Sequence, residues 1–556
     1  MSTLFIRMFI FTVFIAGSTL ANATNSNAIT INIDGVTYQT SLSPNPRIHP
    51  HYDSSTEGST HFIGTLEEHA ESWARLSLID EQWQGVLSIY GTLHVITPSN
   101  STFNNATLMV STIAAKNSNI PMSCGASPLD DNLSSLSNKT VLQQTIDYNS
   151  LCSGTLEGVC MMAELEMAFD LAFQQTFASE TESQIDSILN IVEGYYINDL
   201  NIGFDRITTE LLDSEQFSTS TDPTTLLGDI QSKKINQQLP FIKNNRAIFH
   251  LVTGREFDGS TVGVAYVGTI CNNNGFSSGT SQLIGNNIPL TALVIAHEIG
   301  HNFGSDHDED SCGTGFIMAA SLNASASQFS TCSTDSMQST ISATDDINQC
   351  MNFAVDLSIS EAETNVDEAE QGSEITDQFD LSVTSIFQPV TMLSVTGSVD
   401  NSEGEFTSVS IGGNSCDISN EGQNYQCNLN NPLTTNEILT TLLITGEQLT
   451  TTHSITTITP DNVIDVNFNN NTLTRSLDNI TPPSETPPST TSDNTSTEVS
   501  ETPESTSSSN NEADSSSGGG GAGSMHWPLL ILLMVWSILN RIRLIHEPFK
   551  HLLTNK

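Results

Sequence analysis

The chain has 556 residues, 37% of them hydrophobic, and it carries 63 acidic but only 16 basic residues, a formal net charge of −47. A surface this acidic repels phosphate backbones, so we expect no nucleic-acid partner. At about 100–200 residues per domain, the length predicts two to four domains.

The first residues have the layout of a secretory signal peptide. Arg7 is followed by the apolar run Met8–Ala16 and then by small residues that end in the sequence ANA at Ala23. A positive charge, a short apolar run and an A-x-A cleavage site are typical of such peptides. We therefore predict that residues 1–23 are a signal peptide and that the remainder is exported.

Two folded domains are expected next. Residues 24–155 are predicted to be mainly β, with strand-like alternation in Ile29–Ile33 and Gly85–Ile96. Residues 156–354 alternate strand and helix patterns, which indicates a mixed α/β domain. Its expected elements are strands at Met161–Phe169, Ile202–Leu211 and Ala247–Val252 and a helix at Glu182–Asn198.

The C-terminal third changes in composition. Residues 355–477 contain short runs of Thr, Val, Ile and Ser separated by Asn, Gly, Asp and Pro, which predicts an antiparallel, Ig-like β-sandwich. Residues 478–524 are rich in Ser, Thr and Pro and then in Gly. Such a segment cannot bury enough apolar surface to fold, so we expect a flexible stalk.

Residues 525–556 are predicted to be a hydrophobic sorting or anchor segment. The apolar run Trp527–Leu539 is followed by basic residues, which would stay in the cytoplasm, although a full membrane span needs about 17–25 residues. Together with Gly518–Gly521, this tail resembles the GlyGly-CTERM sorting signal of Gram-negative bacteria. The resemblance implies transient anchoring in the inner membrane, processing by a rhomboid-like protease, and a product on the cell surface or released. Membrane contact is expected only through this segment.

The most informative motif is HEIGHNFGSDHD, within Thr291–Asp308. His297 and His301 are four residues apart, so on a helix they project from one face and can bind one metal ion. Gly304 can adopt the left-handed conformation that ends a helix and turns the chain, which would bring His307 round as a third ligand. Three imidazoles leave one position of a tetrahedral zinc ion open, which is the arrangement of a catalytic site.

Glu298 is the predicted catalytic base. It is one position away from the ligand His297, so it cannot easily share the ligand face but can reach a water molecule on the metal. Zinc lowers the pKa of such a water and polarises a carbonyl group. Glu298 would accept the proton of the water and then pass it to the leaving amine.

This motif resembles the metzincin signature HExxHxxGxxHD, and Asp308 is typical of its adamalysin (reprolysin) branch. His250–Cys271 resembles the segment before the zinc helix of that branch, and CGTGFIM contains Met318 where the family has its Met-turn. The resemblance covers residues 156–354 and implies an α/β metzincin catalytic domain, with a mixed twisted sheet and long helices, that is a zinc metalloendopeptidase. It also implies that the edge strand Thr261–Thr269 binds the peptide backbone of the substrate.

The first predicted domain resembles the prodomain of the same family through Phe62–Ile96. The sequence PMSCGAS, Pro121–Ser127, resembles the cysteine-switch motif of such prodomains. A thiolate is a strong zinc ligand, so Cys124 could fill the open coordination position and keep the precursor latent. The odd count of nine cysteines leaves one thiol free in an exported protein, and Cys124 is the candidate.

The remaining eight cysteines are expected in disulfides. The family resemblance implies the pairs Cys271–Cys350 and Cys312–Cys332. Two cysteines of the third domain and two near the pro/catalytic junction then remain, and they would form Cys416–Cys427 and Cys152–Cys160.

The structural calcium site of many family members is matched here only in part. Glu164 fits one ligand position, but Ala247 and Phe353 stand where an acidic residue and an asparagine are expected. Calcium is therefore neither predicted nor excluded.

Two functions fit these observations. The first is a monomeric zinc metalloendopeptidase that hydrolyses extracellular proteins or peptides, made as a latent zymogen and displayed on the cell surface or released. The second is a surface adhesin or binding protein that retains the protease fold, an alternative favoured by the predicted sandwich and stalk. The intact Glu298 favours the protease.

Overall fold

The computed structural model describes residues 29–48, 59–100, 107–112, 122–127, 147–309, 311–362, 375–387, 389–399, 404–429, 438–448, 450–457 and 463–476. The predicted signal peptide, stalk and C-terminal segment lie outside these residues. The chain divides into two units, residues 1–484 and 485–556, and everything described below belongs to the first. Within the described part, no helix has the length and apolar character needed to cross a membrane.

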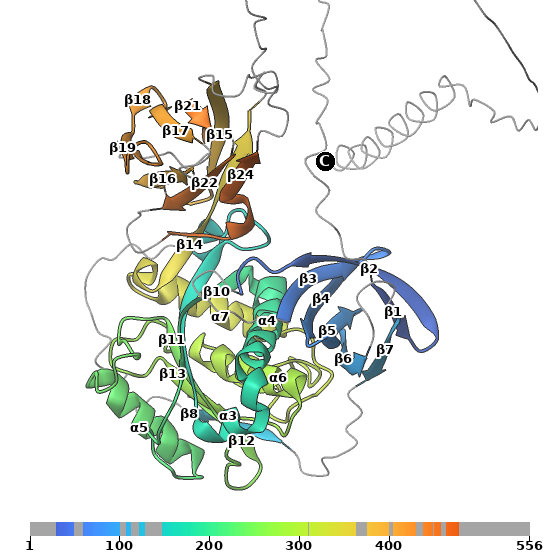
Figure 1. The fold of residues 1–556 in the computed structure, drawn as a ribbon. Helices are drawn as coiled ribbons and strands as arrows, with labels where there is room; N and C mark the ends of the chain where they lie inside the picture. Colours follow the sequence, from blue (N-terminus) through green and yellow to red (C-terminus); the bar gives the residue numbers. More distant parts are fainter. Residues whose placement is uncertain are drawn as a thin grey trace, which may run out of the picture. The chain divides into compact units, whose positions relative to one another are not determined.

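The N-terminal strands form a closed barrel, drawn in blue in Figure 1. Successive strands pair antiparallel, and the barrel closes through a parallel pairing of the first strand with the last. Its interior is apolar and includes the fully buried side chains of Phe62, Leu76 and Trp83. The strands are β1 (Thr30–Ile33), β2 (Val36–Pro44), β3 (Ser59–Leu66), β4 (His69–Ile79), β5 (Gln82–Ile89), β6 (Thr92–Asn100) and β7 (Thr107–Thr112).

The single alternating segment expected at Gly85–Ile96 is wrong, because the chain makes a hairpin there between β5 and β6. The turn residues Tyr90 and Gly91 both have positive φ values, 52° and 72°. A two-residue hairpin of this kind normally uses Asn or Gly at its first position. Tyr90 gives no such signal, so the alternation reads as one continuous strand.

The central sheet is mixed. Its order is β14-β9-β11-β13-β12-β8, with β10 also paired to β9. The pairings among β9, β10, β11 and β13 are parallel, whereas β12 is antiparallel to β13. Every residue of β9 is buried, as expected for a strand covered on both faces. The bounds are β8 (Ser123–Ser127), β9 (Met161–Phe169), β10 (Ile202–Leu211), β11 (Ile248–Thr253), β12 (Thr261–Tyr266), β13 (Ser278–Gln282) and β14 (Met351–Glu361).

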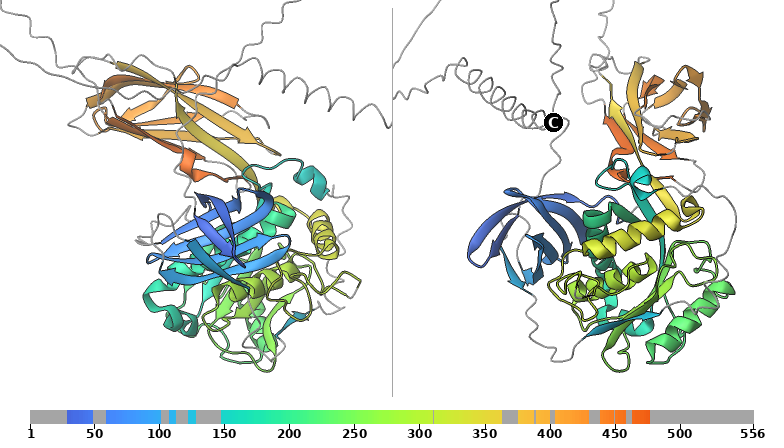
Figure 2. Two further views of the ribbon diagram at one scale, coloured as in Figure 1. Left: turned by 90° about the vertical axis from the view of Figure 1, so that its right-hand side faces the viewer. Right: turned by 180° about the vertical axis from the view of Figure 1, so that it is seen from behind.

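Helices cover both faces of this sheet. In Figures 1 and 2, α4 (Thr181–Leu200) and α6 (Ile288–Asn302) lie on one face and α5 (Pro223–Ile235) on the other. This mixed sheet with long helices agrees with the α/β architecture predicted for residues 156–354. The shorter helical elements are α2 (Tyr148–Leu151), α3 (Leu171–Phe177), η2 (Ala178–Glu180), α7 (Thr331–Ala343) and η3 (Ile347–Gln349).

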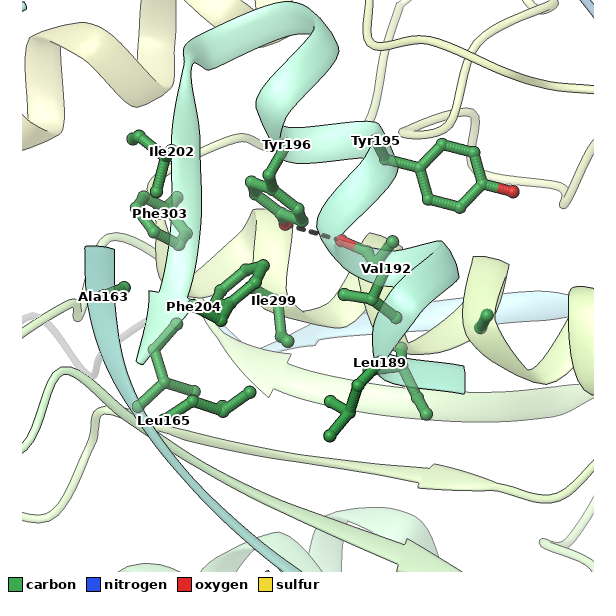
Figure 3. Packing of buried hydrophobic residues seen from close by; sticks show 14 of the residues in the cluster. Ala163, Leu165, Leu189, Val192, Tyr195, Tyr196, Ile202, Phe204, Ile299 and Phe303 are labelled. Carbon is green, nitrogen blue, oxygen red and sulfur yellow. Dashed lines mark hydrogen bonds between the residues drawn. The ribbon is translucent and has the colours of Figure 1, made fainter. Parts of the chain in front are cut away.

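An aromatic cluster joins α4 to α6 (Figure 3). The Tyr196 ring packs against Phe204 and Phe303, with ring centroids 5.0 and 5.4 Å apart. The Tyr196 hydroxyl is fully buried and donates a hydrogen bond of 2.8 Å to the carbonyl of Ala296 on α6. A buried phenol needs such a partner, so this bond fixes the position of α6 against α4.

The sheet continues beyond the α/β region. β14 pairs with β9 at one end and with β15 at the other, so the predicted domain boundary between residues 354 and 355 falls inside one strand. A separate apolar core, including Leu357, Phe379, Val395 and Tyr425, lies between this extension and a second sheet. The remaining elements are β15 (Ile375–Ser385), β16 (Leu393–Ser398), β17 (Gly404–Ile411), β18 (Asn414–Ser415), β19 (Asp417–Ser419), β20 (Asn424–Leu429), β21 (Ile438–Gln448), β22 (Thr450–Thr457), β23 (Val463–Asp465), η5 (Phe468–Asn470) and β24 (Thr472–Ser476).

The predicted boundary at residue 155 likewise does not separate two independent parts. Tyr148 and Leu151 of α2 are buried in the same core as β9 and α6. Upstream, β8 is a strand of the central sheet, although its sequence was assigned to the first domain. The segment before residue 155 therefore contains both the barrel and elements that complete the α/β core.

Candidate active site

Helix α6 carries the motif through the centre of the molecule. The Asn287 side chain caps its N-terminus by accepting a hydrogen bond of 3.0 Å from the backbone N–H of Leu290, and Pro289 lies in the first turn. All residues of α6 are buried. The helix ends at Asn302, and Gly304 follows with φ +106°, where a Cβ would overlap the Thr340 side chain. Only glycine fits this turn.

The turn brings His307 to the two helical histidines. Ring centroids lie 4.8 Å apart for His297 and His301, 5.2 Å for His297 and His307, and 4.9 Å for His301 and His307. One nitrogen from each ring lies within 4.8 Å of the others. The three predicted ligands therefore converge on one point.

Backbone carbonyls orient two of the rings. His297 Nδ1 lies 2.7 Å from the carbonyl oxygen of Ile317, and His301 Nδ1 lies 2.7 Å from that of Ser305. A carbonyl can only accept, so each Nδ1 carries the proton and each Nε2 keeps its lone pair. Burial lowers the pKa of His297 well below its usual value and that of His301 to about 4. Both rings are therefore neutral, the form that binds metal.

The donor set fits a zinc ion. The Nε2 atoms of His297, His301 and His307 are buried and have no hydrogen-bond partner in the protein. Unpartnered buried acceptors are costly, and three that converge indicate a ligand. Neutral imidazoles with oriented Nδ1 atoms are typical zinc ligands. A zinc ion held by these three residues would lower the pKa of a water molecule and polarise a carbonyl group.

Met318 and Asp308 support the third ligand. The fully buried Met318 accepts a hydrogen bond of 2.9 Å at its carbonyl oxygen from the backbone N–H of Asp308. Asp308 Oδ1 accepts hydrogen bonds from the hydroxyls of Ser330 and Ser333, at 2.5 and 2.8 Å, at the start of α7. These bonds fix the turn that carries His307. Met318 is a packing residue, as predicted, and its preceding residue supplies the carbonyl that orients His297.

Glu298 lies beside the histidines in a fully buried position. Burial raises the pKa of its carboxyl group well above the usual range, and an interaction with the Cys124 thiol opposes this rise. The Cys124 sulfur, a Glu298 oxygen and a His297 nitrogen all lie within 4.8 Å of one another. The predicted base and the predicted switch residue therefore occupy the same site as the ligands.

Cys124 reaches this site because β8 is added to the edge of the central sheet. β8 runs parallel to β12, with Cys124 opposite Gly263. On its other side, Met122 accepts a hydrogen bond of 3.0 Å at its carbonyl from the backbone N–H of Leu322. The switch segment is thus paired with the edge strand that the family resemblance assigned to binding the substrate. Sequence reasoning did not predict β8 as a strand, because its short run of small residues has no periodic signal.

The cysteines are arranged as the resemblance implied. Disulfides join Cys271 to Cys350, Cys312 to Cys332, Cys416 to Cys427 and Cys152 to Cys160, and Cys124 is the free, buried thiol among the described cysteines. Cys271–Cys350 ties the segment after β12 to the start of β14. Cys312–Cys332 ties the loop after His307 to the first turn of α7.

The partial calcium motif has a different environment. Glu164 forms an ion pair of 2.8 Å with Arg246, and Asn352 donates a hydrogen bond of 2.8 Å to Asp205. Sequence reasoning compared Phe353 with the expected asparagine and missed its neighbour Asn352. Among the described residues, the groups of acidic, histidine and cysteine side chains close enough to share a metal do not include Glu164.

Comparisons with known proteins agree with this site. Residues 161–330 match the model of metallo-peptidase family M12. The chain is 39% identical over 111 residues to the zinc metalloproteinase-disintegrin-like atragin of Naja atra, which covers 19% of this chain and 17% of that protein. It is 43% identical over 98 residues to a kaouthiagin-like zinc metalloproteinase-disintegrin-like protein of the same snake, covering 17% of this chain and 16% of the relative.

These matches are confined to one part of each protein, because the chain spans less than a fifth of the length of these relatives. The matched family region contains β9, the whole of α6 and all three histidines. The comparisons and the geometry together support a zinc metalloprotease domain of the adamalysin/reprolysin type in this part of the chain.

Proposed function

We propose that the chain is a zinc-dependent metalloendopeptidase that hydrolyses peptide bonds of extracellular proteins and is made as a latent zymogen. One observation carries the proposal: three imidazoles with unpartnered, buried Nε2 atoms, two of them oriented by backbone carbonyls, lie beside the carboxyl group of Glu298 and next to the strand edge that β8 occupies. A structural metal site would not need a neighbouring carboxyl group or a strand edge beside it.

The residues of the site divide the reaction between them. The free edge of β12, once β8 leaves, binds the backbone of an extended peptide through strand addition. His297, His301 and His307 would hold the zinc ion. Glu298 accepts a proton from the attacking water molecule and returns it to the nitrogen of the leaving amine. The water oxygen bonds to the scissile carbonyl carbon, the C–N bond breaks, and the leaving peptide departs as a free amine that carries the transferred proton.

Latency is the second element of the proposal. In the precursor, the Cys124 thiol lies against His297 and Glu298, and β8 occupies the strand edge that a substrate needs. Removal of this segment would free both the ligand position and the edge together. The activating protease is left open.

The cellular setting is proposed from sequence alone. The signal peptide would direct export, and the GlyGly-CTERM-like tail would anchor the chain transiently before surface display or release. We propose a monomer that contacts the membrane only through residues 525–556. The very acidic composition supports an extracellular protein that remains soluble.

The decisive experiment is proteolysis of a denatured, fluorescently labelled protein by the chain after limited proteolytic activation. The wild type, the wild type treated with a zinc chelator and then resupplied with zinc, and Glu298→Gln are compared. Cleavage that disappears with the chelator, returns with zinc and is absent from Glu298→Gln is the expected result. Activated protein that cleaves nothing in the presence of zinc would contradict the proposal and favour the surface-binding alternative.

A further inference from the structure

The polar face of α4 is a second feature that the active site does not use. Gln184, Ser187, Asn190 and Glu193 are buried polar residues of this helix. Each follows the previous one by three residues, so together they form one oblique stripe across the helix surface. Each has a hydrogen-bond partner on the N-terminal barrel.

A buried ion pair is at one end of this stripe. Arg47 Nε lies 2.7 Å from Glu193 Oε1, and the two side chains are 1% and 4% exposed. Asn45 donates hydrogen bonds of 2.9 Å to Glu193 and 3.0 Å to Asn190. Burial raises the pKa of Glu193, but Arg47, Arg75 and these hydrogen bonds outweigh it, so the pKa is lowered overall. The carboxylate is therefore ionised against the barrel.

The stripe continues with neutral hydrogen bonds. The Asn190 side chain donates to the backbone carbonyls of Phe62 and Leu76, at 3.2 Å each. Towards the start of α4, Gln84 donates a hydrogen bond of 2.7 Å to the side chain of Gln184, and the Ser77 hydroxyl donates one of 3.0 Å to the hydroxyl of Ser187. A polar stripe paired along its length is a specific contact, because a displaced barrel would leave these groups unpartnered.

Gly194 completes the fit. A Cβ at this position would lie 2.7 Å from Arg75 Cγ and 3.2 Å from Trp73 Cζ3, both on β4 of the barrel. The Trp73 ring also packs edge-to-face on Tyr195, with centroids 5.4 Å apart. Glycine in mid-helix costs stability relative to alanine, so its presence is explained by the close approach of the barrel rather than by α4 itself.

We propose that the polar face of α4 is a docking surface for the barrel, and that this contact is a second autoinhibitory element that keeps the Cys124 segment in the cleft. The inference rests on the proposed function, because latency has meaning only for an active protease. The docking residues do not belong to the metal site. Two separate contacts on one chain raise the effective concentration of each segment at its site, so weakening either one weakens latency.

The contact also has an apolar part, because Trp73 of the barrel belongs to the same buried cluster as Tyr195 of α4. The polar side chains of Gln184, Ser187, Asn190 and Glu193 can be hydrated once the barrel leaves, which lowers the cost of exposing this face. The processed enzyme would then present an acidic and amide-rich stripe to solvent. The N-terminal part of the chain places two of its few basic residues, Arg47 and Arg75, near Glu193 of this stripe.

The test separates docking from catalysis. A site-specific protease sequence is inserted between Thr112 and Met122 in a full-length Glu298→Gln chain, so that a single cut severs the barrel from the switch segment. Association of the two pieces is measured by gel filtration and by dilution-driven dissociation. The wild-type barrel is expected to remain bound, whereas Arg47→Met, which strands a buried carboxylate, should weaken binding by about 100-fold or more. Lys233→Met removes a partly buried ion pair on α5, away from the barrel, and should not change the binding of the barrel.

Gly194→Ala distinguishes docking from folding. In the cut precursor, this substitution should raise the dissociation constant of the barrel by at least about 10-fold, because the new methyl group would clash with Arg75 and Trp73. In the enzyme without its barrel, the same substitution should leave the Tm unchanged or raise it. The charge swap Arg47→Glu with Glu193→Arg should restore part of the binding lost by either single change.

Outcomes for the two proposals differ. The docking proposal would be overturned if the wild-type barrel separated as readily as the Arg47→Met barrel. It would also be overturned if uncut precursors with an intact active site that carry Arg47→Met or Gly194→Ala were as latent as the wild type. Binding that follows the expected order in a chain with no proteolytic activity would contradict only the proposed function, since association is measured without hydrolysis.

Discussion

Helices α6 and α4 pack side by side, and both bury polar side chains, but in opposite states. On α6, the Nε2 atoms of His297 and His301 have no partner in the protein, whereas on α4 the polar groups of Asn190 and Glu193 are satisfied by the barrel. Unpaired buried polar atoms are retained where a ligand will bind, and paired ones where two surfaces meet. The difference separates the helix of the proposed active site from the helix of the proposed docking surface.

The largest effect is expected from a change to the proposed base, Glu298, on α6. We predict that Glu298→Gln retains zinc but loses about 10³-fold in rate, because removal of a principal general base has that cost. Zinc content and peptide-bond hydrolysis of the activated protein are measured together. Near-normal turnover with zinc bound would show that Glu298 is not the base. Glu193→Gln on α4, assayed after the barrel is removed, is the control that should keep its activity.

The switch residue tests how far the cleft contact alone maintains latency. Cys124→Ala removes the thiol but leaves β8 paired with β12, so the uncut precursor should gain activity by about 10²-fold without reaching the processed level. Ser123 lies beside Cys124 on β8, and Ser123→Ala, which removes only a hydrogen bond to the Ser260 hydroxyl, is the matched control. If the Cys124→Ala precursor stays as silent as the wild type, the thiol has no part in latency.

The turn after α6 is tested through the free energy of unfolding. Gly304→Ala requires a side chain at φ +106° and against Thr340, so the free energy of unfolding should fall by about 1–3 kcal/mol. Urea denaturation measures the change. Gly228 lies within α5, and a Cβ there would have no atom within 4 Å, so Gly228→Ala should raise the free energy of unfolding by about 0.5–1 kcal/mol. Equal effects at the two glycines would show that the turn is not conformationally demanding.

The smallest expected effect concerns the support of His307. Asp308→Asn weakens two charge-assisted hydrogen bonds from Ser330 and Ser333, which should cost about 1 kcal/mol of stability and lower zinc affinity modestly. Asp335→Asn, on the exposed face of α7, should stay within about 0.5 kcal/mol. Thermal unfolding with and without zinc measures both. A variant Asp308→Asn indistinguishable from the wild type would mean that α7 does not hold the third ligand.

Much of the site could be predicted because its chemistry is local. His297, Glu298 and His301 are positioned by helical periodicity alone, and Gly304 marks the turn that returns His307. The parallel strands Met161–Phe169 and Ile202–Leu211 were predicted at their observed bounds. The hairpin at Tyr90 was missed, because tyrosine gives no turn signal.

The long-range contacts could not be predicted in the same way. Nothing in the residues near Ile317 and Ser305 indicates that their carbonyls orient His297 and His301, because backbone acceptors have no sequence signature. The addition of β8 to β12 joins segments that are far apart in the chain. On α4, Asn190 and Glu193 are polar residues that sequence patterns assign to a solvated face, although the barrel buries them.

The amino-acid sequence was enough to predict the three candidate ligands, the proposed base and the presence of one free thiol, because helical spacing, a glycine turn and cysteine parity act over short distances or on composition alone. The tertiary structure alone decided that Cys124 lies against Glu298 and that Arg47 pairs with Glu193. Those contacts depend on how a sheet edge and a barrel surface meet the helices, and burial of a polar group is a property of its surroundings rather than of the residue.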